Sequence, residues 1–492
     1  MTEAVPIGDT PLTVADVVSV AYGAPVTLEP AARERIRASR AVVDAVLASG
    51  AAVYGLTTGV GHLKDTRLPD GELVAFQAFL LGSHAAGVGE AAPDEVVRAA
   101  MFTRLAGLAR GGSGASPAVA DVLRDMLNAG VHPVIETGGS VGAGDLGQMA
   151  TIGLVAVGGG SARLRGAVLP GAEALAGAGI TPLTLAPKDG LALLSANGLS
   201  VGRGALVVDR AARIAAAADV ATAVSLEAFR GNVSPLLPAV GAAKPYPGQI
   251  ASARRQLAAL AGGDLPAPGS ARSVQDPLSF RVAAQVNGAL RDYVDAAGRA
   301  VETELNSASD NPLVGAETGE MIHNGNFHPM VMAIAFDALR VAIAHAGMLS
   351  ERRMSHLWDL FFASGGIPPA GTVELYGMSL RYSAAALVGD LRHLAGPATL
   401  DVPPLDQSIE DHATGAPAAV ARTADALDAL AGILAIELLL GADIIAVTGV
   451  TGLGEGTGGA VRLVREAVAA SADRSPAAVH RAIRDTVVPA VV

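Results

Sequence analysis

Alanine-rich segments with apolar residues spaced three and four positions apart dominate the chain. This spacing places the apolar side chains along one face of an α-helix. Strand-like alternation is rare and short, as at residues 162–169. The pattern therefore predicts an all-α fold, with long helices over residues 31–47, 95–109, 205–229, 275–305, 330–360, 383–394 and 423–447.

Clusters of glycine and proline separate these segments and predict breaks between the helices. The breaks fall at residues 111–117, 235–247, 262–269, 365–371 and 452–459. We expect two regions along the chain. Residues 1–200 would form a mixed helical region with a glycine-rich active-site loop, and residues 201–492 a central long-helix bundle with C-terminal helices.

The longest apolar run, residues 427–447, raises the question of a membrane span. A spanning helix needs about 20 apolar residues with few or no charges. This run contains Asp428, Glu437 and Asp443, so we expect a helix in a protein core. The first ten residues lack the basic and apolar regions of a signal peptide. We therefore expect a cytoplasmic protein.

Composition narrows the class of partner. Hydrophobic residues make up 51% of the chain and charged residues 17%, which favours a large interface between subunits. The net charge of −12 argues against nucleic acid as the main partner. The chain has no cysteine and no HExxH pattern, so we expect no metal site. The glycine runs at 158–160 and 452–456 lack the Lys-Ser/Thr of a phosphate-binding loop and are interpreted as structural turns.

Several segments combine glycine with rare polar residues, a combination that packing does not require. A tyrosine beside a glycine-rich loop, as at Tyr54, can serve as a general acid or base. In chain order the segments are YGLTTGVG at 54–61, SHAAG at 83–87, GSVGAGDL at 139–146, QDP at 275–277 followed by Arg281, NSASDNP at 306–312, GNFH at 325–328 and EDH at 410–412.

In this order the segments resemble the aromatic amino-acid ammonia-lyase superfamily, and its histidine ammonia-lyase branch most. The blocks of that family read YGxNTGFG, SHAAGxG, GSVGASGDL, QDxYSLR, NSxxDNP, GNFH and QEDH. The resemblance runs from about Val53 to about Arg465. It implies a long-helix bundle of the fumarase-like type, assembled as a homotetramer with active sites where subunits meet. Tyr54 and His84 would then approach Arg281 or Glu410 only when partner chains are present.

The resemblance also implies roles for single residues. Tyr54 would be the base that removes the β-proton of an amino acid, with Glu410 in the acid–base set. Arg281 would pair with the substrate carboxylate, for which its planar fork is well shaped. His84 and Glu410 would recognise the substrate side chain. The family asparagine that also binds substrate would be Asn197, although Ser195 lies close to the same position.

Each of these residues also has a purely structural interpretation. Arg281 could belong to an ion pair, and His84 could be a core histidine with its hydrogen bonds satisfied. Glu410 and Asp411 could cap a helix. His328 is expected to be structural, and Asp145 is expected to order its loop.

The departures from the family pattern concern its electrophile. In the family, an Ala-Ser-Gly tripeptide cyclises and loses two waters to give a methylidene-imidazolone. This chain has only Ala143 and Gly144 after Gly142, one residue fewer and without the serine. No methylidene can form without a β-hydroxyl to eliminate, and Ser140 is a poor substitute because Val141 follows it. We therefore expect no such cofactor.

Other family positions differ as well. Leu278 replaces the tyrosine of QDxYSLR, Thr57 the asparagine of YGxNTG, and Ile409 the glutamine of QEDH. Three hypotheses follow. The protein could be a lyase that acts on a small amino acid or related carboxylic acid without the electrophile, so that its substrate needs a better leaving group or a more acidic C–H. It could be a conventional histidine-type ammonia-lyase, or a non-catalytic binding or scaffold homologue.

Overall fold

Long helices and short strands make up a computed structural model that describes residues 3–365, 375–400 and 402–491. The strands are two to four residues long. The chain divides into two compact units. The first comprises Met1–Asp209, Gly298–Phe336 and Ala398–Val420, and the second comprises Arg210–Ala297, Asp337–Pro397 and Ala421–Val492. The sequence-based boundary at residue 200 lies near the end of the first segment, but two later segments also belong to the first unit.

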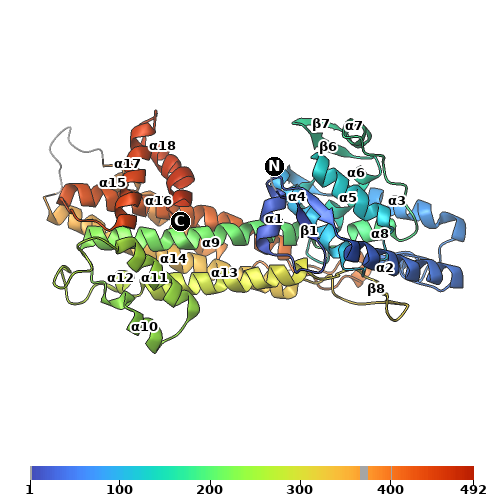
Figure 1. Ribbon diagram of the computed structural model, residues 1–492, viewed down its shortest axis with the longest axis horizontal. Helices are drawn as coiled ribbons and strands as arrows, with labels where there is room; N and C mark the ends of the chain where they lie inside the picture. The colour runs from blue at the N-terminus through green and yellow to red at the C-terminus, as the bar shows by residue number, and fades with distance from the viewer. Residues whose placement is uncertain (1–2, 366–374, 401, 492) are drawn as a thin grey trace. The chain divides into compact units, whose positions relative to one another are not determined.

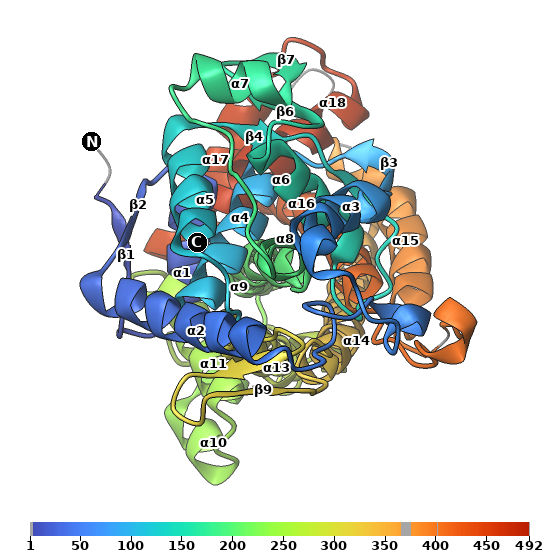
Figure 2. The same ribbon diagram turned by 90° about the vertical axis from the view of Figure 1, so that its right-hand side faces the viewer.

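The first unit is built from shorter helices and small two- and three-stranded sheets. Its sheets pair β1 with β2, β3 with β5, β4 with β6 and β7, and β8 with β9. The helices α3, α6 and α8 pack against one another (Figure 2). The helices are α1 (Val14–Ala21), α2 (Pro30–Ser49), α3 (Leu73–His84), α4 (Asp94–Ala109), α5 (Pro117–Ala129), α6 (Leu146–Ala156), α7 (Gly171–Gly177) and α8 (Asp189–Leu194).

Short strands and 3-10 turns lie between the helices of this unit. The strands are β1 (Val5–Ile7), β2 (Val26–Leu28), β3 (Val88–Ala91), β4 (His132–Pro133), β5 (Glu136–Gly138), β6 (Ser161–Leu164), β7 (Ala167–Pro170), β8 (Leu313–Gly315) and β9 (Glu320–Ile322). The 3-10 turns are η1 (Gly61–Leu63), η2 (Asp70–Glu72) and η4 (Asp406–Ser408).

Among the described residues, four long helices contribute residues to both units, and the second unit adds shorter ones (Figure 1). The long helices are α9 (Gly198–Phe229), α13 (Ala283–Leu305), α14 (Met330–Ala363) and α16 (Ala416–Thr448). The others are η3 (Ser234–Leu236), α10 (Pro238–Ala243), α11 (Pro247–Leu260), α12 (Leu278–Arg281), α15 (Gly377–Leu394), α17 (Glu455–Ala470), α18 (Pro476–Ala482), η5 (Ile483–Val487) and α19 (Val488–Ala490).

Buried charges fix how the long helices pack in the second unit. Glu437 of α16 is fully buried, and its carboxylate accepts two hydrogen bonds from Arg353 of α14 at 2.6 and 2.9 Å. The hydroxyl of Ser225 on α9 donates to the same carboxylate at 2.7 Å. A buried charge is tolerated when its remaining lone pairs are satisfied in this way. The carboxylate therefore joins three helices at one point.

The most apolar helix of the chain is packed inside the protein. Three stretches, Asp189–Phe229, Met330–Ala363 and Ala416–Thr448, are long and apolar enough to span a membrane by length and composition. In the stretch Ala416–Thr448, 89% of the most apolar window is buried inside the protein. The prediction of a core helix at residues 427–447 is confirmed, because its apolar side chains pack against protein.

Most predicted elements are confirmed, and the differences have local causes. Residues 162–169 form the hairpin β6–β7, whose turn places Arg165 and Gly166 at φ of 50° and 84°, as a two-residue hairpin turn demands. The helix predicted over 275–305 is wrong at its start, because α12 begins at Leu278, after Pro277, and α13 at Ala283. The predicted break at 365–371 lies almost wholly outside the described residues.

The break predicted at residues 452–459 is also wrong in part, because α17 begins at Glu455. Here the glycines serve close packing. A Cβ on Gly456 would lie 2.7 Å from the Cα of Ala259 in α11. The glycines therefore allow two helices to approach, and the helix continues through them.

Candidate active site

Tyr54 lies in a tight loop of the first unit that follows α2. The Thr57 hydroxyl accepts from the backbone N–H of Val53 at 2.8 Å and donates to the Ala51 carbonyl at 2.8 Å. Thr57 is buried, so the residue that replaces the family asparagine holds this loop together. The phenol oxygen of Tyr54 accepts a hydrogen bond from the Gly61 N–H at 3.0 Å.

The surroundings of Tyr54 keep its phenol protonated. Burial raises the pKa of Tyr54, and the nearby carboxylates of Glu410 and Asp406 raise it further, while the Gly61 hydrogen bond lowers it. Loss of the phenol proton is therefore disfavoured until a positive charge arrives next to it.

His84 ends α3, with its ring partly exposed. Its Nδ1 lies 2.9 Å from the Leu80 carbonyl oxygen, so Nδ1 must carry the proton and donate. Nε2 of the neutral ring is then left as an acceptor. His84 is only partly buried, so it is not a core histidine.

Glu410 is the last residue of a turn that begins at Leu405. Two backbone hydrogen bonds between these residues, of 2.8 and 3.3 Å, close the turn. Partial burial raises the pKa of Glu410, Asp406 raises it further, and His84 lowers it. The residue remains exposed and caps no helix, since α16 begins at Ala416.

Glu410 therefore lies near enough to interact electrostatically with both Tyr54 and His84 within a single chain. The expectation that Glu410 approaches Tyr54 and His84 only through partner chains is wrong. The reason is topological: residues 398–420 return to the first unit between two segments of the second.

The loop at residues 139–145 has no hydroxyl where the family electrophile forms. Gly142 and Gly144 adopt φ of 83° and 85°. The Ser140 hydroxyl donates to the buried carboxylate of Asp145 at 2.7 Å, and it accepts from the Gly142 N–H at 3.2 Å. Ser140 is therefore engaged in holding the loop, and Ala143 offers only a methyl group. These residues do not fit a methylidene-imidazolone.

Hydrogen bonds of Asn197 and Asp145 hold this loop in place. The Asn197 Oδ1 accepts from the Gly144 N–H at 3.1 Å, and its Nδ2 donates to the Phe327 carbonyl at 3.0 Å. Asp145 accepts from the N–H and hydroxyl of Ser200 at 2.7 and 3.0 Å. Asn197 thus contacts the loop directly, and its role in binding substrate stays a prediction. Ser195 is buried at the end of α8.

The segment after Glu410 ties the loop to the rest of the site. The Thr414 hydroxyl donates to the Gly142 carbonyl at 2.7 Å, and the Gly415 N–H donates to the Val141 carbonyl at 2.9 Å. His328 Nε2 lies 3.3 Å from the His412 carbonyl oxygen, in keeping with a structural role. Burial lowers the pKa of His328.

Arg281 is the last residue of α12 and belongs to the second unit, whereas Tyr54, His84 and Glu410 belong to the first. Among the described residues its guanidinium has no ion pair or side-chain hydrogen bond, so the ion-pair interpretation finds no partner there. Leu278, at the start of the same helix, is exposed. The role of Arg281 as a carboxylate clamp stays a prediction.

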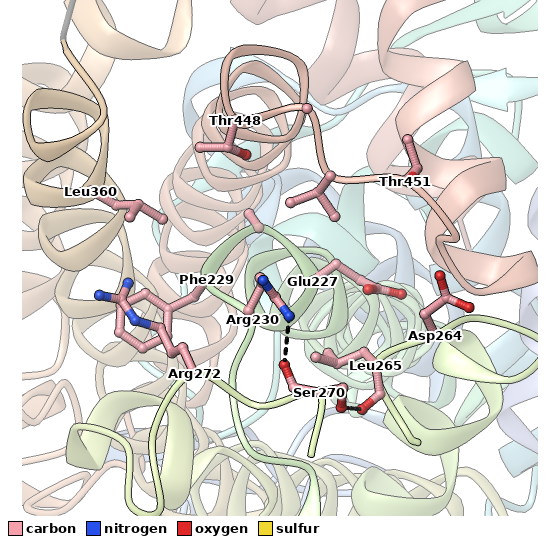
Figure 3. Close-up of a pocket in the computed structure, with 13 residues that line it drawn as sticks. Glu227, Phe229, Arg230, Asp264, Leu265, Ser270, Arg272, Leu360, Thr448 and Thr451 are labelled. Carbon is pink, nitrogen blue, oxygen red and sulfur yellow. Dashed lines mark hydrogen bonds between the residues drawn. The ribbon is translucent and has the colours of Figure 1, made fainter. Parts of the chain in front are cut away.

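The second unit has a hollow of its own, of about 530 Å³ (Figure 3). Arg272 lies over the ring of Phe229, 4.5 Å from its centroid, and Arg230 donates to the Ser270 carbonyl. Glu227 and Asp264 line its other side. None of the predicted site residues lines this hollow, and Glu227 in it accepts hydrogen bonds from the Gly454 N–H and the Thr457 hydroxyl at 2.9 and 3.1 Å.

Sequence reasoning missed three residues that shape the site. Asp406 binds the backbone and ring of His62, and Thr414 holds the loop at Gly142. Asp406 and His62 are 344 positions apart, and no spacing rule joins residues at such a separation. The only available signal was the polar run just before Glu410.

Comparisons with known proteins agree with this arrangement. The aromatic amino acid lyase family matches residues 12–466. A histidine ammonia-lyase from Gloeobacter violaceus is 41% identical, over 93% of this chain and 90% of the relative. Ergothionase from Treponema denticola, an ergothioneine-degrading enzyme, has a TM-score of 0.93 at 31% identity, over 99% of both chains. A tyrosine aminomutase from Streptomyces globisporus has a TM-score of 0.90 at 30% identity, over 99% of this chain and 97% of the other.

The family match covers most of the chain, and the relatives align with it over nearly their full lengths. The chain therefore belongs to the aromatic amino acid lyase family and is an enzyme of the ammonia-lyase type.

Proposed function

We propose that this enzyme eliminates a nitrogen leaving group from an imidazole-bearing amino acid or its derivative without a methylidene-imidazolone. The observation that carries the proposal is the loop at residues 142–144, where Ala143 is followed directly by Gly144. Without the electrophile, the substrate must bring a nitrogen that is already activated.

The electrostatics around Tyr54 support a cationic substrate. Two carboxylates, Glu410 and Asp406, raise the pKa of Tyr54 beyond the effect of burial. A substrate cation about 5 Å from the phenol would offset them by about 3 kcal/mol at an effective dielectric constant of about 20. A quaternary ammonium keeps its charge at every pH, so it would favour the tyrosinate that the reaction needs.

The proposed step balances as a simple elimination. The Tyr54 phenolate takes a proton from Cβ, and the C–H electron pair forms the Cα=Cβ double bond. The C–N bond breaks, and its electron pair leaves with nitrogen as a neutral amine. Nε2 of His84 and the Glu410 carboxylate would hold the imidazole ring, and Arg281 would hold the carboxylate.

Ergothioneine, the trimethylammonium betaine of 2-thiohistidine, has the required chemistry. The structural likeness to an ergothioneine-degrading enzyme supports this substrate class. A second candidate is histidine ammonia-lyase proper. The names of the curated relatives, which are 37–41% identical, support this second candidate more directly, whereas the loop chemistry argues for the first.

Turnover of the purified protein separates the two candidates. Ergothioneine and L-histidine are supplied separately, and the released amine and unsaturated acid are identified by NMR. The first candidate predicts trimethylamine from ergothioneine and little urocanate from histidine. Robust urocanate formation that is lost in Tyr54→Phe would overturn it in favour of the second. Tyr54→Phe should abolish either reaction while changing ligand affinity only a few-fold.

We also propose a homotetramer in which Arg281 from another copy completes the site. Apolar residues stay exposed along α14 at spacings of three and seven: Val331, Ile334, Val341 and Met348. A stripe of this spacing on one helix face is suited to another helix. Light scattering should give the mass of four chains, and a monomeric mass would contradict the proposal.

A further inference from the structure

One carboxylate joins the loop that carries Tyr54 to the turn that carries Glu410. Asp406 Oδ2 accepts from the backbone N–H of His62 at 2.9 Å, and Oδ1 lies 2.6 Å from His62 Nδ1. Asp406 thereby holds both the main chain and the ring of His62. Both residues belong to the first unit.

The backbone on both sides is bent to allow this contact. Asp406, Gln407 and Ser408 adopt φ of 44°, 55° and 65°, a left-handed conformation that is unfavourable for a residue other than glycine. Such strain persists where the surrounding contacts enforce it. On the other side, Gly61 has φ of 58°, and a Cβ there would lie 2.0 Å from Asp406 Oδ2.

His62 is adjacent to the residue that binds the Tyr54 phenol, and Asp406 lies in the turn that ends at Glu410. The Gly61 N–H, next to His62, donates to the Tyr54 phenol oxygen. The turn that begins at Asp406 closes through the paired backbone of Leu405 and Glu410. The position of the phenol and that of the carboxylate are therefore set by the same contact.

We propose, resting on the proposed function, that His62 and Asp406 form a positioning pair that holds Tyr54 in register with Glu410. Both residues act through their neighbours: His62 through the Gly61 N–H, and Asp406 through the turn. Loss of either member should release both segments.

Hydrogen exchange tests the pair without any need for turnover. In Asp406→Ala, the His62 amide should exchange at least about tenfold faster. In His62→Ala, the amides of Leu405 and Glu410 should do so, although they lie far away in sequence. Asp65→Ala is the matched control, because Asp65 is exposed three positions after His62 and its carboxylate, among the described residues, pairs only with Lys64. Unchanged exchange in both variants would overturn the proposal.

A tyrosine titration reports on the phenol itself. The absorbance change of phenolate formation is recorded for the protein and for Tyr54→Phe, and the difference isolates Tyr54 among the six tyrosines. Because the Gly61 hydrogen bond lowers the pKa of Tyr54, His62→Ala should raise it, and Asp65→Ala should not. An unchanged titration in His62→Ala would refute the positioning role.

Kinetics then separates positioning from binding. With ergothioneine or L-histidine as the probe, each alanine variant should lower kcat by about 10- to 100-fold, with KM changed less than threefold. The double variant should be no slower than the slower single one, and Asp406→Asn should recover part of the rate. If neither probe is turned over, the proposed function fails while the exchange and titration still decide the pair. An unchanged kcat in the alanine variants would overturn the proposal.

Discussion

Lys188 offers the sharpest test of the charges buried in the first unit. Its side chain is fully buried at the start of α8, and among the described residues its Nζ has no hydrogen-bond partner. Burial lowers its pKa from 10.5 to about 8, Asp310 and Asp189 oppose this, and Arg104 adds to it. The change to test is Lys188→Met, which removes the charge and nearly keeps the length.

The expected gain follows from the gap between the two pKa values. The pKa in the folded protein lies below that in the unfolded chain. The stability that Lys188 contributes in its neutral form is therefore fully present above pH 10.5 and is lost as the pH falls through about 8. At pH 7 the charge costs about 3 kcal/mol. Lys188→Met should recover up to that amount at pH 7 and only about 1 kcal/mol at pH 9.5.

The assay is a pair of thermal scans at the two pH values. For a chain of this length, about 3 kcal/mol corresponds to a rise in Tm of about 3 °C. Lys244→Met, at an exposed position, is the control and should leave Tm nearly unchanged. A fall in Tm for Lys188→Met at pH 7 would refute the reasoning, because it would mean that the buried ammonium has a stabilising partner.

Three further changes test the loop and the helical core. Gly142→Ala should abolish activity, because its Cβ would lie 2.3 Å from a threonine hydroxyl at a φ of 83°, whereas Gly82→Ala, in open space, should stay active. Glu437→Gln should cost about 3–5 kcal/mol in the free energy of unfolding, measured in urea, because it leaves the Arg353 charge buried and unpaired. Burial raises the pKa of Glu304 to about 7. The stability that its protonated carboxyl contributes is therefore present below pH 4.5 and is lost as the pH rises through 7. Glu304→Gln should flatten the resulting fall in Tm between pH 5 and pH 8.

The helices were predictable from sequence because their signals are local. Pro30 begins α2, and Gly50, at a φ of 68°, ends it, as the rules for helix ends anticipate. The error at residues 452–459 arose because glycine serves both turns and close packing. Only the neighbouring helix, at Ala259, decides between the two.

The site was predictable in part for the same reason. Tyr54, His84 and Glu410 stand in local motifs, and within one chain Glu410 lies near enough to affect the electrostatics of the other two. Their contact depends on residues 398–420 joining the first unit, which no local pattern encodes. The Asp406–His62 contact depends on the same return of the chain.

The central claim is that this enzyme works without the family electrophile, and the mass of the protein tests it most directly. Intact-protein mass spectrometry, followed by sequencing of the peptide that contains Gly142–Asp145, should give the encoded mass with no water lost. A peptide lighter by two water molecules at these residues would contradict the account and would establish ordinary histidine ammonia-lyase chemistry in its place.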